Sequence, residues 1–226
     1  MPAPGGDAVR ELMAAVQGGK VTEADVDARL AELLPLIFDT RTALDKSPKI
    51  LDEAVHHALA RKAAAESIVL LKNEGDILPL KAGQKVALIG DFAETPRYQG
   101  AGSSMVNSTK VDTLKEQLTE AGVNIIGFET GFNRHGAPDD TLKVNAGLLA
   151  KRADVVLLCL GLDEIAESEG LDRSHMRLAQ NQLDLLSFLA KGNPNIIVLL
   201  HCGSVVETPW LSECKALVWA ALGGQA

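Results

Sequence analysis

An apolar run that ends on a glycine, Val155–Gly161, limits the folds open to this chain more than any other feature. A short run of this kind, bounded by turn residues, is typical of a strand buried on both faces of a parallel sheet. The loop that follows, residues 162–173, is rich in carboxylates and ends in Arg173. Ligands of open α/β sheets bind beyond the carboxyl ends of such strands. The loop is therefore a candidate site, and an acidic, solvated turn is the alternative interpretation.

Similar apolar runs alternate with segments of helical period through residues 81–226. Helices are predicted near 110–122, 140–152 and 178–189 from apolar positions that recur every three or four residues. Strands are predicted at 86–90, 124–128, 155–161, 196–200 and 216–219. This alternation predicts an α/β sandwich, with a mainly parallel sheet of about five to six strands flanked by helices.

Residues 1–80 do not share this alternation. Helices are predicted over 7–16, from Thr22 onward, and after Pro48, the last of them running into Ile68–Asn73. We therefore expect a helical segment at 1–80 and an α/β sandwich domain at 81–226, with the boundary near Leu80.

Charge and composition argue against two classes of partner. A net charge of −8 and a pI near 5.1 disfavour binding to nucleic acid or to an anionic membrane surface. No apolar stretch approaches the roughly 18 residues of a membrane span, and the first residues do not resemble a signal peptide. The cysteines, Cys159, Cys202 and Cys214, lie in or beside apolar runs and are expected to be buried, reduced thiols. A cytoplasmic location is the expectation.

Gly90 and the loop Gly100–Ser104 have the composition of a phosphate-binding turn, but not its spacing. Dinucleotide sites place their glycines in the tight turn between strand and helix, whereas roughly ten residues separate Gly90 from Gly100. Ser103 and Ser104 also lack the G-x-S-x-G frame of a hydrolase nucleophile. A binding loop for a polar ligand, or a simple turn, is favoured over a nucleotide site.

Four histidines were also considered as site residues. His56 and His57 lie in a predicted helix without an acidic partner at metal-ligand spacing. His175 is close to the acidic loop and is interpreted as a surface residue, while His201 ends a predicted strand and is expected in the core or the crevice.

The acidic loop has a chemical use if its carboxylates lie close together. Neighbouring carboxylates raise the pKa of a carboxyl, and a general acid at neutral pH needs such a raised pKa. Glycosidases use one carboxyl in this way to protonate the leaving oxygen, with a second carboxylate across the scissile bond. Acid catalysis of glycoside cleavage is therefore a hypothesis for this loop.

Three motifs together resemble glycoside hydrolase family 3, the β-glucosidase and β-xylosidase group. They are Ala60–Asn73 followed by Leu78–Leu80, Tyr98–Ser104, and Glu169–Arg173. Val86–Gly90, Pro209–Trp210 and Gly224–Ala226 also look like family positions, so the match spans nearly the whole chain in the family's order. The resemblance implies a barrel domain, similar to a (β/α)₈ fold, that carries an aspartate nucleophile. It also implies an α/β sandwich that carries the acid/base glutamate. This chain looks like the sandwich and the helices before it, without most of the barrel.

The resemblance also implies roles for individual residues. Glu169 is the expected acid/base, and Glu167 is the alternative because this loop varies in length within the family. Asp172 and Arg173 are candidate substrate-binding residues, although an ion pair between them that fixes the loop is the favoured interpretation. Ser103, together with Ser104, is expected next to the substrate.

The expected function is part of a retaining exo-glycosidase that hydrolyses β-glucosides or related glycosides. Its partners would be a glycoside substrate and the missing N-terminal barrel in cis, with no nucleic acid, no membrane, and no metal or organic cofactor. The face that would meet the barrel is expected to be partly apolar and could mediate a homo-oligomer. The alternative is a non-catalytic carbohydrate-binding or docking module. The chain alone is expected to be inactive.

Overall fold

The computed structural model describes residues 7–44, 51–103 and 105–224, and the chain forms two compact units that meet in sequence at Leu51 and Asp52. The predicted helix start at Pro48 and the candidate residue Ser104 lie outside the described residues. Among the described helices, none combines the length and the apolar character needed to cross a bilayer.

The first unit consists of two helices, α1 (Asp7–Gln17) and α2 (Glu23–Leu44), as predicted. Thr22 and Asp25 cap α2 reciprocally, because the Asp25 amide donates to Thr22 Oγ1 at 3.2 Å and the Thr22 amide donates to Asp25 Oδ2 at 3.0 Å. Neither helix buries a residue. Their large apolar side chains are exposed, among them Leu33, Ile37 and Phe38.

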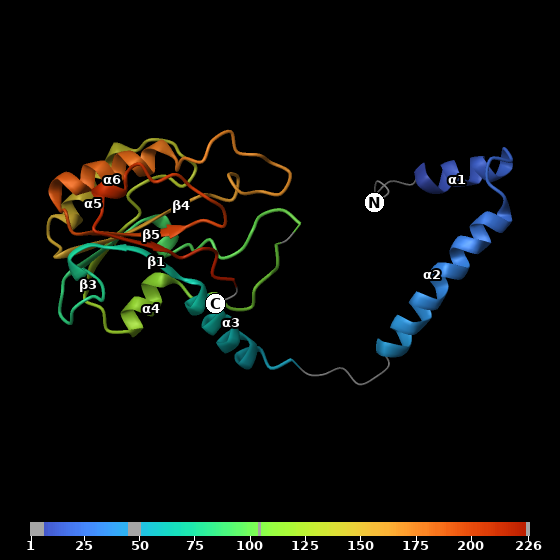
Figure 1. Cartoon of the computed structure of the whole chain (residues 1–226), viewed down its shortest axis with the longest axis horizontal. Helices are drawn as coiled ribbons and strands as arrows, with labels where there is room; N and C mark the ends of the chain where they lie inside the picture. Colours follow the sequence, from blue (N-terminus) through green and yellow to red (C-terminus); the bar gives the residue numbers. More distant parts are fainter. Residues whose placement is uncertain (1–6, 45–50, 104, 225–226) are drawn as a thin grey trace. The chain divides into compact units, whose positions relative to one another are not determined.

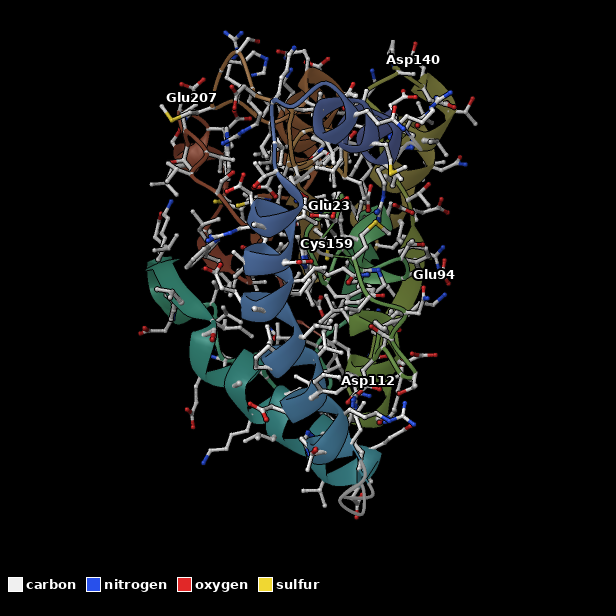
Figure 2. The ribbon with its side chains drawn as sticks, turned by 90° about the vertical axis from the view of Figure 1, so that its right-hand side faces the viewer. Glu23, Glu94, Asp112, Asp140, Cys159 and Glu207 are labelled. Atoms are coloured by element: carbon white, nitrogen blue, oxygen red, sulfur yellow. The ribbon has the colours of Figure 1, made fainter. Side chains whose placement is uncertain are left out.

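The second unit begins with α3 (Glu53–Ser67), whose first turn is capped by Asp52 through a bond from the Val55 amide. His57 Nε2 lies 3.2 Å from Asp112 Oδ2, a residue labelled in Figure 2. The acidic partner that the local sequence did not provide for His57 therefore comes from a segment 55 residues further along the chain. This contact fixes α3 to the segment that precedes α4.

One six-stranded sheet forms the centre of the second unit, in the order β1-β6-β5-β4-β2-β3. All neighbouring strands are parallel except β1, which is antiparallel to β6. The strands are β1 (Val69–Asn73), β2 (Val86–Ile89), β3 (Ile125–Glu129), β4 (Val155–Gly161), β5 (Ile196–His201) and β6 (Ala216–Trp219). The predicted α/β sandwich with a mainly parallel sheet is confirmed.

Helices cover both sides of this sheet. Figure 1 shows α5 and α6 side by side on one side and α4 on the other. The helices are α4 (Leu114–Glu120), α5 (Asp140–Ala150) and α6 (Gln180–Gly192), and short 3₁₀ turns lie at Glu74–Asp76, Asp91–Ala93 and Leu211–Glu213. Gly147 lets α5 approach α6 closely, because a Cβ there would lie 2.5 Å from the Phe188 ring.

The strand β1 differs from the prediction, which placed residues 69–73 in the helical segment. Ile68 has an extended backbone that ends α3, and Val69–Asn73 then pairs with β6. Apolar and β-branched residues such as Val69 and Leu70 fit a pleated strand at the edge of a sheet. The compact unit therefore begins near Asp52, before the expected boundary at Leu80.

The core is centred on β4, in which all seven residues are buried. Leu185, Leu186 and Leu189 of α6 pack into the same core from one face of the sheet. Cys159, Cys202 and Cys214 are buried free thiols, as expected, and burial raises the pKa of Cys159 to about 12. The Cys159 side chain is labelled in Figure 2.

Glycines allow the central strands to lie close together where they end. Gly90 follows β2 with φ of 114°, and a Cβ there would lie 2.2 Å from the carbonyl oxygen of Cys159. Gly161 ends β4, and a Cβ there would lie 2.1 Å from the carbonyl oxygen of His201. Because both close contacts are to backbone, neither can be relieved by a side-chain rotation.

Replacing Gly90 by alanine should lower the free energy of unfolding by about 2 kcal/mol or more, because the new Cβ meets backbone and the φ angle is strained for an L residue. Urea unfolding followed by circular dichroism measures this change. Gly192→Ala is the control, since only ordinary contacts surround that position at the end of α6 and it should be neutral or slightly stabilising. Equal stability of the Gly90→Ala and wild-type chains would contradict the prediction.

Candidate active site

The loops that follow β2 and β4 lie at one edge of the sheet, because these strands are parallel neighbours. The strand order also reverses between them, since β3 lies on the far side of β2, and ligands of α/β sheets bind at such reversals. Ala101 and Ser168 form a parallel bridge between the two loops, and the Glu169 amide donates to the carbonyl of Ala101 at 3.2 Å. The topology therefore brings the Gly100–Ser103 motif to the acidic loop.

Glu169 is exposed, and its carboxylate accepts hydrogen bonds from Ser103. The Ser103 amide donates to Glu169 Oε2 at 2.9 Å, and the Ser103 hydroxyl donates to the same oxygen. These two bonds, from the hydroxyl first and the amide second, lower the pKa of Glu169 below its ordinary value. Both residues are separate candidates in the sequence, and the structure brings them together.

Glu167 lies in a different environment, although it is only two residues away. Its side chain is 9% exposed and that of Arg97 is 1% exposed, and the Arg97 guanidinium donates to Glu167 Oε2. The Gly203 amide donates to the same oxygen at 3.1 Å, while the Ser204 hydroxyl donates to Oε1. Burial alone would raise the pKa of Glu167, but the bonds from Ser204, Arg97 and Gly203 outweigh it and hold the pKa below the ordinary value. Glu167 is thus an ionised anchor.

The expectation of a raised pKa in this loop is wrong for both glutamates. It assumed that the carboxylates face one another, whereas each of them faces donors from another part of the chain. Asp163 lies 3.3 Å from His135 Nδ1, and Glu164 lies 2.6 Å from Arg134 Nη1. The carboxylates of these residues are therefore paired with donors from other loops and not with one another.

Arg173 also fixes the loop, but through a different contact from the one expected. No Asp172–Arg173 ion pair is found within the described residues. Arg173 Nη2 instead donates to Ser204 Oγ at 3.0 Å and to the carbonyl of Val205 at 2.8 Å. Asp172 is exposed. Glu167 and Arg173 therefore meet at Ser204, and together they join the acidic loop to the loop after β5.

Arg134 is a second residue that fixes the loops, and it was not among the predicted site residues. Its guanidinium bonds Asp91 Oδ2, the carbonyl of Thr95 and Glu164, and it lies 4.5 Å from the centre of the Phe92 ring. Arg134 thus joins the turn after β2, the loop after β3 and the acidic loop. Its only signal in the sequence is a basic residue in a polar loop after a strand.

His201 stacks on Phe92, the ring that Arg134 also contacts, with the two ring centres 5.7 Å apart. The residue is partly buried, and its Nε2 is buried without a hydrogen-bond partner among the described residues. Burial, with a smaller contribution from the charge of Arg134, lowers the pKa of His201 to about 4. The expected core or crevice position is confirmed, and the residue is a neutral part of the packing.

A cavity of about 410 Å³ opens beside the acidic loop. Its lining combines the charged or polar side chains of His135, Asp163 and Arg173 with the apolar side chains of Ile165 and Leu171. His175 is exposed, as expected. Within residues 7–44, 51–103 and 105–224, no group of three or more His, Cys, Asp or Glu side chains could hold a metal ion.

Removing the carboxylate of Glu167 should destabilise the second unit by about 3–5 kcal/mol, because Glu167→Ala leaves the buried Arg97 charge without its partner. Glu169→Ala is the matched control, and this exposed position should change stability by no more than about 0.5 kcal/mol. Urea unfolding of the two variants measures the difference. Similar midpoints for the two variants would show that Glu167 is not the anchor of this loop.

Stability should fall on acidification between pH 6.5 and pH 4 because of His201. In the unfolded chain this histidine binds a proton near pH 6.5, whereas in the folded chain it stays neutral down to about pH 4. The unfolded state therefore binds more protons in this window, and the slope reaches about 1.4 kcal/mol per pH unit. His201→Phe, which retains a ring against Phe92, should reduce the slope in unfolding experiments across this range. An unchanged slope would contradict this assignment.

Comparison with known proteins identifies the group to which this fold and site belong. Residues 68–226 match the sequence description of the "Glycosyl hydrolase family 3 C-terminal domain". The chain is 41% identical to the thermostable beta-glucosidase B of Acetivibrio thermocellus over 231 residues, covering 100% of this chain and 30% of that protein. It is 40% identical to an exo-alpha-(1->6)-L-arabinopyranosidase of Bifidobacterium breve, with 96% of this chain and 30% of the relative covered.

Solved structures agree with these matches. A crystal structure of the GH3 beta-glucosidase from Bifidobacterium adolescentis aligns with a TM-score of 0.84 and 40% identity, over 99% of this chain and 33% of that chain. This chain therefore spans about a third of the length of the relatives it matches. The chain belongs to glycosyl hydrolase family 3 and contains the C-terminal domain of that family.

Proposed function

We propose that this chain is the acid/base-bearing part of a retaining exo-glycosidase that hydrolyses β-glucosides or related glycosides. Glu169 protonates the departing oxygen and later activates water. The nucleophile is an aspartate in a barrel domain, within the part of the relatives that this chain does not cover. In retaining glycosidases the two carboxyls lie about 5–5.5 Å apart, so the two domains must dock closely.

The contrast between Glu169 and Glu167 carries this proposal. The Glu167 carboxylate is hydrogen-bonded to Arg97, Gly203 and Ser204, and its side chain is only 9% exposed. Glu169 is exposed at the carboxyl edge of the sheet, where α/β proteins bind ligands. The relatives named above are glycosidases that act on gluco- and arabinopyranosides, which supports this class of reaction.

The lowered pKa of Glu169 explains why the domain would need its partner. A carboxyl that is ionised at neutral pH cannot act as a general acid. A docked barrel would remove water from Glu169 and bring the nucleophile carboxylate close to it, and both changes raise the pKa of a carboxyl. The acid would therefore acquire its working protonation state only in the assembled protein.

The first unit is proposed to be the end of the preceding domain and to pack against that domain. Its helices leave Leu33, Ile37 and Phe38 exposed, whereas helices of globular proteins bury such a set of side chains. The same exposed side chains provide a surface for self-association when the rest of the protein is absent.

Glu169→Gln should lower glycoside hydrolysis by about a hundred- to ten-thousand-fold, because an amide cannot donate the proton. The assay uses a chimera, in which this chain replaces its matching segment in the Acetivibrio thermocellus relative, and a panel of nitrophenyl glucosides, xylosides and arabinopyranosides. Substrates whose leaving groups need protonation should lose the most activity.

One control variant and the outcome for Glu169→Gln separate the alternatives. Glu167→Gln removes a charge from the anchor but no substrate contact, so any loss of its activity should follow a loss of folded protein in circular dichroism. If Glu169→Gln leaves the rate of the active chimera unchanged, the acid/base assignment is wrong. A non-catalytic carbohydrate-binding or docking module would then be the better interpretation, and sugar binding by this chain without any catalytic effect of its carboxylates would identify it.

A further inference from the structure

We propose that Ser103 is a positioning residue, which holds one oxygen of the Glu169 carboxylate so that the other oxygen faces the substrate. This inference rests on the proposed role of Glu169 as the acid/base. It gives a specific role to Ser103, which the sequence analysis expects next to the substrate. The proposal concerns how the acid is oriented, and it follows from the contacts between the loops after β2 and β4.

The two loops are joined at consecutive residues. Ala101 bridges to Ser168 and accepts the Glu169 amide at 3.2 Å, so the backbone of the acid is fixed by the neighbouring loop. Gly102 has a φ of 95°, and a Cβ at this position would lie 2.8 Å from the Cβ of Glu169. Only a residue without a side chain lets the loop approach the acid this closely.

Ser103 then holds the side chain of the acid. Both its amide and its hydroxyl donate to Oε2 of Glu169, while Oε1 receives no hydrogen bond from the described residues. Two donors on one oxygen restrict rotation of the carboxyl group and differentiate its two oxygens. A proton on this group is therefore favoured on Oε1, because Oε2 already accepts two hydrogen bonds.

This asymmetry suits both halves of a retaining reaction. In the first half, Oε1 gives its proton to the glycosidic oxygen as the C–O bond breaks and the nucleophile bonds to the anomeric carbon. The negative charge left on Glu169 is stabilised by the Ser103 donors at Oε2. In the second half, Oε1 takes a proton from water as the water oxygen bonds to the anomeric carbon and the nucleophile leaves.

Ser103 should therefore influence the acid without touching the substrate. Its bonds favour the carboxylate, so they assist the step in which Glu169 gives up its proton and make Glu169 a weaker base in the second half. Ser103→Ala removes the hydroxyl donor but retains the amide donor. The pKa of Glu169 should then rise toward its ordinary value.

The first test uses this chain alone and does not depend on catalysis. The Glu169 carboxyl carbon and the Ser103 amide are followed by NMR from pH 2.5 to pH 7, and Glu169→Gln assigns both signals. In the wild-type chain the two signals should titrate together, at a pKa below that of an ordinary glutamate. Ser103→Ala should raise this pKa, Ser103→Thr should retain the low value, and Thr109→Ala, in an exposed part of the same loop, should have no effect.

The second test uses the chimera with the Acetivibrio thermocellus relative. Ser103→Ala should move the alkaline limb of the pH profile of kcat/KM to higher pH, because Glu169 with a raised pKa stays protonated up to a higher pH. A residue that only binds sugar would raise KM and leave this limb in place.

The outcomes of the two tests are separable. If the pKa of Glu169 is the same in Ser103→Ala and wild-type chains, the positioning role is wrong, even when the chimera is active. If the chimera is inactive although folded, the proposed glycosidase function is contradicted, and the NMR comparison still decides whether Ser103 holds the carboxylate.

Discussion

The reversal of strand order between β2 and β4 is the constraint on which the site depends. It places two loops side by side that are more than sixty residues apart in sequence. The close approach of these strands needs Gly90, where any side chain would meet the backbone of β4. Every contact of Glu169 described above follows from this arrangement, since all its partners belong to the loop after β2.

Two glutamates in one loop show how environment separates chemically identical groups. The buried pair of Glu167 with Arg97 loses solvation on both sides, and such pairs contribute little net stability compared with apolar packing. Their value here is geometric, because the pair and the bonds from Gly203 and Ser204 join three loops. Because the loop is already fixed in this way, the contacts with Ala101 and Ser103 are sufficient to orient Glu169.

The sequence predicts most of the fold and part of the site, for identifiable physical reasons. The β4 strand could be predicted from its continuous apolar run, and the helices α5 and α6 from apolar residues at helical spacing. The strand β1 was missed because it follows a helix directly, and its apolar residues continue the helical pattern.

The partners of the carboxylates could not be predicted in the same way. Arg97 lies 70 residues from Glu167, and Arg134 lies 30 residues from Glu164. Only the strand order determines which of these residues meet, so the direction of the pKa shift of Glu169 was predicted wrongly. Glu169 and Ser103 could be selected as candidates because a motif resemblance, unlike a pKa, does not require knowledge of the neighbouring side chains.

The antiparallel edge strand β1 has a consequence for how such a domain can be exchanged between proteins. The strand is contributed by residues that precede the parallel part of the sheet, and the family match begins at residue 68, immediately before it. A recombination joint placed between β1 and β2 would leave the edge of β6 unpaired, and unpaired edges promote aggregation. A joint that passes on this domain with its sheet intact must therefore lie ahead of β1.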